Sequence, residues 1–572
     1  MAGLPKFRPS LPHWVRESRG QVLQDDLLAG LITAVLLVPQ GMALAMLAGL
    51  PPMLGLYAGI LPPLLYAFLG SSRTLAVGPG SVVALLVANA LAGQGLSPGD
   101  AAWVSGAIML SVLCAGILLL MALLRMGELT SFLSHPVLSG FTSGAAVVII
   151  LSQVPQLTGS GKAAGTWIPH VPTLFLGAGC LLLLVLSRSP LQRLLARGGL
   201  SGRSSLFVSR AAPLVVVLGA TLLTALLALP DRGVAVVGDI PGGLPSLALP
   251  TMDQGSLRDL LPAALVISLV AFVESASVAR MLAWRRRQRI DSNRELLALG
   301  VANAGAALSG TMPVSGTFGR STANFDAGAR TQLAGIVTAA LVALTALVLA
   351  PLFRYLPLAA LAAVIMVVVF PLINLEALRR TWRFDRADAA ALLVTFFGVV
   401  LIDIELGLLA GLLLSVAIFL WRTGHPHCAV VGRIPGSSHY RNVDHYDVDT
   451  WSDLLLLRID ESLYFANTAT LEQVVAHNVA DRPDLRHVVL IFSAVNRIDH
   501  SALETLEMLV ENLHEAGLEL HLAEVKGPVM ARIRHSGLLE QMQPGQVFLT
   551  PEEAVSRLHS PDRPSVRSGE HG

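Results

Sequence analysis

The sequence predicts a polytopic α-helical membrane protein that carries a small soluble α/β domain at its C-terminal end. Hydrophobic residues make up 53% of the chain and charged residues only 14%, whereas about 25% are charged in an average soluble protein. The shortfall is confined to residues 27–421, a series of apolar runs broken by Gly, Pro and short basic loops. Residues 422–572 have a normal charged complement and alternate strand-like with helix-like patterns, which is typical of an α/β domain.

These differences divide the chain into five segments. The last residues are rich in Ser, Pro, Arg and Gly, a composition typical of disorder. The net charge of +1 gives no indication of a nucleic-acid partner. We expect a cytoplasmic N-terminal segment (1–24), a transmembrane domain (25–422), a linker (423–440), a soluble α/β domain (441–559) and a disordered tail (560–572).

The apolar part contains fourteen candidate membrane spans, since a spanning helix needs about 20 apolar residues. The third and the tenth are short and interrupted, and they occupy corresponding positions in two seven-span halves. The candidates are 27–48, 53–69, 78–94, 102–125, 135–156, 171–187, 211–229, 257–283, 294–311, 316–328, 331–351, 357–375, 387–402 and 406–421.

The orientation follows from the basic residues of the short loops. Arginines gather after the sixth, eighth and twelfth spans, whereas the loops after odd-numbered spans are poor in Lys and Arg. Because cytoplasmic loops carry an excess of these residues, we expect both termini in the cytoplasm. Binding of lipid head groups is an alternative role for the arginine clusters. The expected location is the plasma membrane, which is the inner membrane in a bacterium.

The third and tenth spans are interrupted in similar ways. In the third, Gly78 and Pro79 stop any helix from arriving, and Pro79 suits the first turn of a helix that begins there. In the tenth, the Gly-rich segment 312–322 leads into a helical run. Irregular backbone at membrane depth is tolerated only where it is buried in protein or lines a cavity. Matching interruptions in two halves therefore predict a midplane site of inverted repeats, and two helix N-termini there favour an anion.

Polar residues inside the spans are the candidates for function. Arg320, in the first turn of the tenth span, either attracts an anion or serves structurally by pairing with a carboxylate or reaching the interface. Glu274, in the eighth span, takes up and releases a proton, neutralises Arg320 or has no role. Gln40, in the first span, contacts the anion or bridges helices.

Several motifs make the chain resemble the SulP sulfate-permease family, which includes the anion exchangers and the prestin branch of animals. The resemblance covers nearly the whole chain. The motifs near the N-terminus are Pro39-Gln-Gly-Met-Ala-Leu-Ala45, Ala48-Gly-Leu-Pro-Pro-Met-Leu-Gly-Leu-Tyr57, Gly70-Ser-Ser-Arg73 and Gly78-Pro79. The later motifs are Ser315-Gly-Thr-Phe-Gly-Arg-Ser321 and Ala327-Gly-Ala-Arg-Thr-Gln332.

The resemblance implies fourteen spans as a 7+7 inverted repeat, divided into a core domain and a gate domain, with the anion between the N-termini of spans 3 and 10. It implies that Glu274 occupies the acidic position at which some members handle a coupling cation. It also implies a homodimer. The substrate-binding residues carried over by position are Gln40, Leu44, Gly80, Ser81, Phe318, Gly319, Arg320 and Ser321.

The chain departs from the prestin branch at three of these positions. Leu44 and Gly80 stand where that branch has aromatic residues, and Gly319 stands where it has a serine. We therefore expect a roomier pocket lined more by backbone, which leaves oxyanions and dicarboxylates open as substrates.

The soluble part resembles a STAS domain. Leu463-Tyr-Phe-Ala-Asn467 is similar to the strand-to-helix entry of that domain, and Ile498-Asp-His-Ser-Ala502 is similar to its Asp-Ser-Ser-Gly loop. In the related anti-sigma-factor antagonists the switch Ser directly follows the Asp, and here His500 holds that place. The domain is expected to bind a cytoplasmic protein partner.

Three functions remain open on the sequence. The first is proton-coupled uptake of a small anion of the sulfate, dicarboxylate or bicarbonate class by alternating access. The second is sodium-coupled bicarbonate symport, in which sodium replaces the proton at Glu274. The third, from another class, is a membrane sensor or scaffold that signals through the STAS domain. We expect no cofactor, no metal site and no enzymatic activity, because no nucleophile and base occur together.

Overall fold

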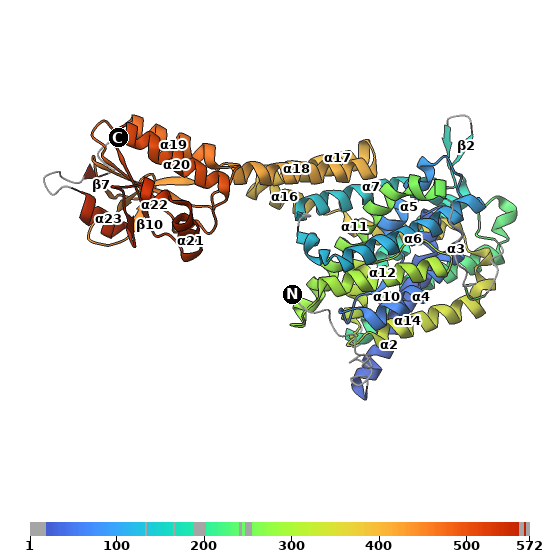
Figure 1. Ribbon diagram of the computed structural model, residues 1–572. Coiled ribbons are helices and arrows are strands. Elements are labelled where there is room, and N and C mark those ends of the chain that lie inside the picture. The colour runs from blue at the N-terminus through green and yellow to red at the C-terminus, as the bar shows by residue number, and fades with distance from the viewer. Residues whose placement is uncertain are drawn as a thin grey trace. The chain divides into compact units, whose positions relative to one another are not determined.

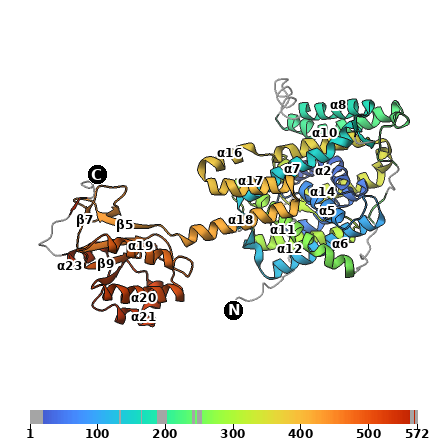
Figure 2. The ribbon, with the colours of Figure 1, turned by 90° about the horizontal axis from the view of Figure 1, so that it is seen from above.

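The computed structural model describes residues 19–131, 134–163, 166–187, 202–238, 243–245, 254–559 and 566–567. The chain divides into two compact units, Met1–Ser415 and Val416–Gly572, which Figures 1 and 2 show from two sides. Most of the expected N-terminal segment (1–24) and of the expected disordered tail (560–572) lies outside the described residues.

The first unit is helical and is built from apolar segments that Pro, Gly and capping residues delimit. The side chain of Asp291 accepts hydrogen bonds from two backbone N–H groups of the first turn of α12, and Asp385 does the same for α17. The α-helices are α2 (Gln21–Leu47), α3 (Pro52–Tyr57), α4 (Leu61–Leu69), α5 (Ser81–Gly93), α6 (Ala101–Leu123), α7 (His135–Thr158), α8 (Val171–Ser187), α10 (Gly202–Leu226), α11 (Gln254–Arg285), α12 (Ser292–Leu308), α13 (Phe318–Asp326), α14 (Leu333–Leu344), α15 (Leu358–Val369), α16 (Leu375–Phe384), α17 (Arg386–Leu401) and α18 (Ile404–Gly424). Shorter turns of other helix types are η1 (Met126–Ser131), η2 (Leu229–Arg232), η3 (Thr345–Leu349), η4 (Ala350–Tyr355) and η5 (Phe370–Leu372).

Each predicted span falls on one or two of these helices. Within the described part of the chain, eight helical segments are long and apolar enough to cross a membrane. The predicted third and tenth spans correspond to α5 and α13, of 13 and 9 residues. At 1.5 Å per residue these helices cover roughly 20 and 14 Å of a hydrocarbon core of about 30 Å. The prediction that these two spans are short and interrupted is therefore confirmed.

The segments before α5 and α13 pair with each other. Strand β1 (Val77–Gly78) runs antiparallel to β4 (Ser315–Gly316), with Val77 opposite Gly316 and Gly78 opposite Ser315. Two polar side chains bind the backbone around β4: Asn303 bonds both the N–H and the carbonyl of Val314, and the Ser275 hydroxyl accepts from Gly316 N–H at 2.7 Å. These bonds satisfy extended backbone that lies inside the protein, as an interrupted span requires.

Helices α2 and α3 approach each other at two glycines. A Cβ atom built on Gly55 would lie 2.0 Å from the carbonyl oxygen of Gly41, and one on Gly41 would lie 2.9 Å from the carbonyl oxygen of Gly55. Small residues permit such backbone contact between membrane helices. The contact positions the segment of α2 that carries Gln40.

The second unit is an α/β domain. Among the residues described, eight strands form one sheet in the order β11-β10-β9-β8-β5-β7-β12, and β6 pairs with β5. Strands β8 to β11 are parallel, whereas β5 is antiparallel to β8. The strands are β5 (Cys428–Arg433), β6 (Tyr440–Asn442), β7 (Asp449–Thr450), β8 (Leu454–Ile459), β9 (His487–Ile491), β10 (Glu519–Ala523), β11 (Val547–Phe548) and β12 (Val566–Arg567).

Helices cover both faces of this sheet. Side chains from α19 (Thr468–Ala480), α20 (His500–Glu515), α21 (Gly527–Ser536) and α22 (Leu538–Gln541) share one buried core with the sheet, and α19 to α21 can be followed in Figure 2. Side chains from α23 (Pro551–Leu558) and Trp451 pack on the other face. The alternation of strands and helices predicted for this domain is present. Strand β5 lies inside the segment expected as a linker, 423–440.

Candidate functional site

The pairing of β1 with β4 brings two helix N-termini together. Gly80 is the N-cap of α5 and Thr317 is the N-cap of α13, and neither end has a side-chain cap. The first bonds within the helices run from Ala84 N–H to the Gly80 carbonyl and from Ser321 N–H to the Thr317 carbonyl. The first three amides of each helix therefore have no partner inside the helix, and both dipoles present their positive ends here.

Ser315 lies between these helix ends. A Cβ atom on Gly80 would meet the Ser315 hydroxyl at 2.4 Å, so the hydroxyl occupies the space beside this glycine. The same hydroxyl donates to Glu274 at 3.4 Å. The expectation that Gly80 makes the pocket roomier is therefore wrong at this position, because a serine that the sequence argument did not single out fills the volume. Gly319 differs, since a Cβ atom there would meet nothing within 4 Å.

The segment of α2 that carries two expected site residues borders α5. A Cβ atom on Gly41 would lie 3.7 Å from the Pro79 ring, which places this part of α2 beside the segment that leads into α5. The Gln40 side chain is half-buried, and Leu44, one turn further along α2, is fully buried. An amide near two free helix ends can donate a hydrogen bond to an anion.

The four expected residues of α13 face different surroundings. Phe318 and Gly319 are exposed, so they face open space at the helix end. Arg320 and Ser321 are buried, at 1% and 0% exposure. The Ser321 hydroxyl accepts a hydrogen bond from Ala76 N–H at 3.0 Å, which ties α13 to the segment before β1.

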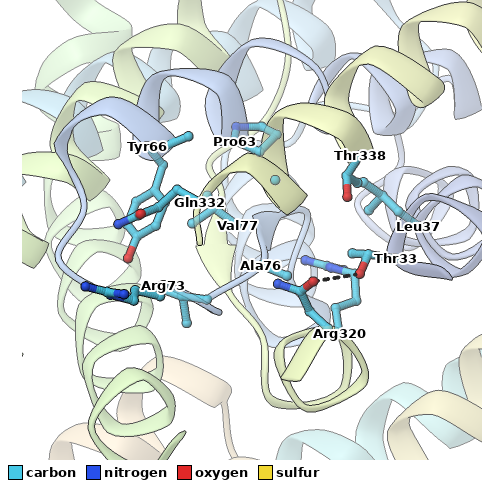
Figure 3. A pocket seen from close by; sticks show the side chains of 14 residues that line it. Thr33, Leu37, Pro63, Tyr66, Arg73, Ala76, Val77, Arg320, Gln332 and Thr338 are labelled. Atoms are coloured by element: carbon cyan, nitrogen blue, oxygen red, sulfur yellow. Dashed lines mark hydrogen bonds between the residues drawn. The ribbon is translucent and has the colours of Figure 1, made fainter. Parts of the chain in front are cut away.

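The Arg320 guanidinium lies beside β1, since a Cβ atom on Gly78 would lie 3.3 Å from one of its nitrogens. Its side chain lines a cavity formed by α2, α4, the β1 segment and α14, and none of the other expected substrate residues lines that cavity. Figure 3 shows the guanidinium beside Thr33 and Ala76. Glu274 interacts with Arg320 electrostatically, although no ion pair joins them among the described residues. Arg320 thus adds positive potential behind the helix ends.

Sequence reasoning missed the polar residues that shape the interrupted backbone. Ser275 and Asn303 hold the backbone around β4, and Ser315 contacts Glu274. A signal for one of them was present: Ser275 directly follows Glu274 inside an apolar run. Together the arrangement offers free amides, one amide side chain and a nearby cation, which are the elements of a site for a small anion.

Comparison with known proteins identifies the family. Residues 23–395 match the Sulfate permease family, and residues 445–554 match the STAS domain. The chain belongs to the sulfate permease family. Its relatives include the Probable sulfate transporter 4.2 of Arabidopsis thaliana, which is 34% identical over 96% of this chain and 84% of the relative. A probable sulfate transporter of Mycobacterium tuberculosis is 34% identical over 94% of this chain and 96% of the relative.

Two solved structures share this fold. The murine Solute Carrier 26 family member A9 anion transporter in the inward-facing state superposes with a TM-score of 0.84 at 24% identity, covering 95% of this chain and 92% of that one. The transmembrane domain of the cyanobacterial bicarbonate transporter BicA superposes with a TM-score of 0.55 at 22% identity, covering 70% of this chain and 98% of that one. The predicted helical membrane fold with a C-terminal STAS domain is therefore confirmed.

The loop of the STAS domain that resembles the Asp-Ser-Ser-Gly segment has a structural role. Asp499 is the N-cap of α20: its carboxylate accepts from Ala502 N–H at 2.8 Å and from Phe465 N–H at 2.9 Å. His500 is exposed and pairs with Glu504 within the helix. The Asp499 carboxylate thus joins the entry segment to this loop.

A cluster of groups that often bind metals lies on the sheet of the STAS domain. The donor atoms of His487, Glu519 and His521 lie within 4.8 Å of one another. However, Gln546 N–H donates to Nδ1 of His521 at 3.0 Å. In the neutral ring the proton is therefore on Nε2, which faces His487 and Glu519 and cannot at the same time offer a lone pair to a metal. We interpret the cluster as a hydrogen-bonded group.

The buried histidine of this cluster predicts that the stability of the STAS domain depends on pH. Burial, together with the neighbouring His487, lowers the pKa of His521 to about 4, whereas an unfolded histidine has a pKa of about 6.5. As the pH falls below about 6.5, the unfolded chain binds a proton that the folded domain does not, so stability decreases until the pH approaches 4. Between pH 7.5 and 5.0 we expect a loss on the order of 2 kcal/mol, measured as amide-exchange protection of β10 after correction for intrinsic rates. His521→Gln should remove this loss and the exposed control His477→Gln should keep it; the same loss in both variants would contradict the assignment.

Proposed function

We propose that this permease is a secondary active transporter of a small oxyanion of the sulfate class, coupled to protons, and that it works by alternating access. The observation that carries the proposal is the pair of uncapped helix N-termini at Gly80 and Thr317, held together by β1 and β4. Their free amides can bind several oxygens of one anion without a stoichiometric counter-charge. The names of the relatives, which are sulfate transporters, favour sulfate as the first substrate to test.

In this proposal the anion contacts the first residues of α5 and α13 and the side chain of Gln40. The expected residues Ser81, Phe318 and Gly319 contribute through their backbone amides. Leu44 forms an apolar part of the wall of the site. Ser321 holds α13 in place through its hydrogen bond to the segment before β1. Arg320 contributes positive charge from beside β1, the strand that leads into α5.

Glu274 is the proposed coupling group. It is half-buried in α11, and the Ser315 hydroxyl that donates to it also stands beside Gly80 at the helix end. A proton on this carboxylate would change both the charge and the hydrogen bonding next to the bound anion. Protonation on import offsets the negative charge that the anion carries through apolar surroundings.

The remaining expectations form part of the same proposal. Both termini would lie in the cytoplasm, and the chain would reside in the plasma membrane, as the arginine distribution predicts. We also propose a homodimer and a cytoplasmic protein partner for the STAS domain.

The coupling role gives a direct prediction for Glu274→Gln. Purified protein in liposomes should accumulate sulfate when an inward proton gradient is imposed. In Glu274→Gln we expect uptake to fall to its level without a gradient, because an amide cannot exchange a proton at this position. Sulfate exchange at equal pH should persist, since the helix ends are intact.

Glu376→Gln is a matched control, because Glu376 is exposed on α16. It should keep full stimulation by the proton gradient. Proton coupling that survives in Glu274→Gln would refute the assigned role. Uptake of bicarbonate that requires sodium and ignores the proton gradient would favour sodium-coupled symport, and binding of a protein partner without uptake of any anion would favour a sensor.

A further inference from the structure

Helix α16 connects two predicted membrane spans. It begins at Leu375, where the predicted twelfth span (357–375) ends, and α17 corresponds to the predicted thirteenth span (387–402). Its ten residues cover roughly 15 Å, half of a hydrocarbon core of about 30 Å. Asp385 alone separates α16 from α17, and Figure 2 shows the two helices beside each other. Because the connection between successive spans lies at a membrane surface, α16 is expected near the boundary between the hydrocarbon core and the head groups.

The side chains of α16 fall on distinct faces. Ala377, Leu378 and Thr381 are half-buried and face the rest of the protein. Successive residues of a helix are rotated by about 100°, which places the arginines of α16 on the opposite, exposed face, with apolar side chains on either side of them. The exposed residues are Arg379, Arg380 and Arg383 on the basic face and Leu375, Trp382 and Phe384 at its edges.

The basic face carries positive charge that the protein does not neutralise. Within the part of the chain that the structure describes, Arg379, Arg380 and Arg383 form no ion pair and no side-chain hydrogen bond. Glu376 is the acidic residue of this helix, so three arginines less one glutamate leave it with a net charge of +2. Like charges that lie one turn apart on a helix repel each other, so a bound anion would stabilise this face.

The arginines that follow the eighth span are placed differently. Arg286 donates to the backbone carbonyls of Phe325 and Ala329, and its guanidinium lies over the Phe325 ring. Part of that cluster therefore holds the end of α13. The arginines of α16 have no such structural role among the described residues, and their donors are open to a ligand.

The composition of the exposed surface indicates which ligand this is. A guanidinium binds a phosphate group through two N–H donors, and arginines at a membrane surface attract anionic lipids. Exposed Trp382 and Leu375 beside the arginines favour contact with the adjoining acyl chains. A dissolved anion would contact only the arginines, whereas a lipid contacts both groups of side chains. We propose that α16 binds an anionic phospholipid: its arginines bind the phosphate, and its exposed apolar side chains contact the acyl chains.

Three variants test the role of the charge. In the Gln variant the three arginines of α16 are replaced together by Gln, and in the Lys variant they are replaced by Lys, which keeps their charge. Both variants change exposed side chains only, so the fold should persist. The matched control removes the same charge from exposed positions of the STAS domain, with the substitutions Arg441→Gln, Arg497→Gln and Arg534→Gln.

The measurement is native mass spectrometry of the purified full-length protein in a non-ionic detergent, titrated with dioleoylphosphatidylglycerol or dioleoylphosphatidylcholine. The wild type should bind the first phosphatidylglycerol at least roughly tenfold more tightly than phosphatidylcholine, because each basic residue near an anionic lipid contributes several-fold in affinity. The Gln variant should lower this ratio to about twofold or less. The Lys variant and the STAS control should keep the ratio, and added salt should weaken it in the wild type.

Four results would overturn the lipid site. They are a wild type that does not distinguish the two lipids, an undiminished ratio in the Gln variant, a Lys variant that loses the ratio as fully as the Gln variant, and an equal loss in the STAS control. The same spectra record the oligomeric state. A Gln variant that keeps its lipid preference but no longer forms the dimer of the wild type would assign this face to contact between two copies. Lipid binding is measured without transport, so failure of the lipid site and failure of the proposed function are distinguishable.

Discussion

Gly55→Ala is expected to destabilise the membrane unit by on the order of 3 kcal/mol and to abolish most sulfate uptake. The added methyl group would lie 2.0 Å from the carbonyl oxygen of Gly41 and 2.4 Å from its carbonyl carbon. These are backbone atoms, which cannot rotate away, so α2 and α3 must move apart. Because Gly41 is next to Gln40 and close to Pro79, the movement also displaces one wall of the candidate anion site.

Thermal unfolding in detergent and sulfate uptake into liposomes measure the two effects. Gly116→Ala is the control, since a Cβ atom at Gly116 meets nothing within 4 Å and alanine favours a helix over glycine. That variant should unfold at or slightly above the wild-type temperature. Wild-type stability in Gly55→Ala would show that the two helices do not pack as described.

Glu295→Ala is expected to have an effect of similar size, about 4 kcal/mol. Glu295 is completely buried on α12. Its carboxylate accepts four hydrogen bonds, from the Tyr66 hydroxyl at 2.6 Å, from Ser71 N–H and the Ser71 hydroxyl at 2.7 and 2.6 Å, and from Ser72 N–H at 3.0 Å. Removal of the carboxylate leaves two backbone donors without their acceptor, at the end of α4 where the chain turns toward β1.

A graded series tests this role. Glu295→Gln keeps one carbonyl oxygen but places an NH₂ group against donors, so its unfolding temperature should lie between those of the wild type and Glu295→Ala. The exposed control Glu376→Ala should match the wild type. Equal stability of Glu295→Ala and the wild type would mean that the four hydrogen bonds make no net contribution to the free energy of unfolding.

The helical part of the fold was predictable because its signals are local. Long apolar runs predict membrane helices, and the Gly78-Pro79 pair and the Gly-rich segment before α13 predict where helices are interrupted. Each of these predictions needs only about twenty residues of sequence. The meeting of α5 and α13 was predictable because the two interruptions fall at equivalent places in the two halves. The short strands β5, β6 and β7 were missed, since two to six residues show too little periodicity.

Side-chain direction at the site was not predictable from these signals. The sequence places Arg320 in the first turn of α13, but the rotation of that helix depends on packing against α2 and on the bond between Ser321 and Ala76. The neighbourhood of Gly80 likewise depends on Ser315, 235 positions away in the sequence. Glu295 looked like an ordinary charged residue near the start of a helix, because its partners lie more than 220 positions away.

The two-residue pairing between β1 and β4 also restricts the selectivity of the permease among anions of different size. This pairing joins the two interrupted segments directly ahead of α5 and α13, so in the proposed transport cycle we expect the spacing between the two helix ends to stay constant. An anion that enters from either side of the membrane meets the same opening between the same amides. Under the proposed mechanism, discrimination by size should therefore be identical for influx and efflux, and any directional preference should come from the gradient and from the proposed protonation of Glu274.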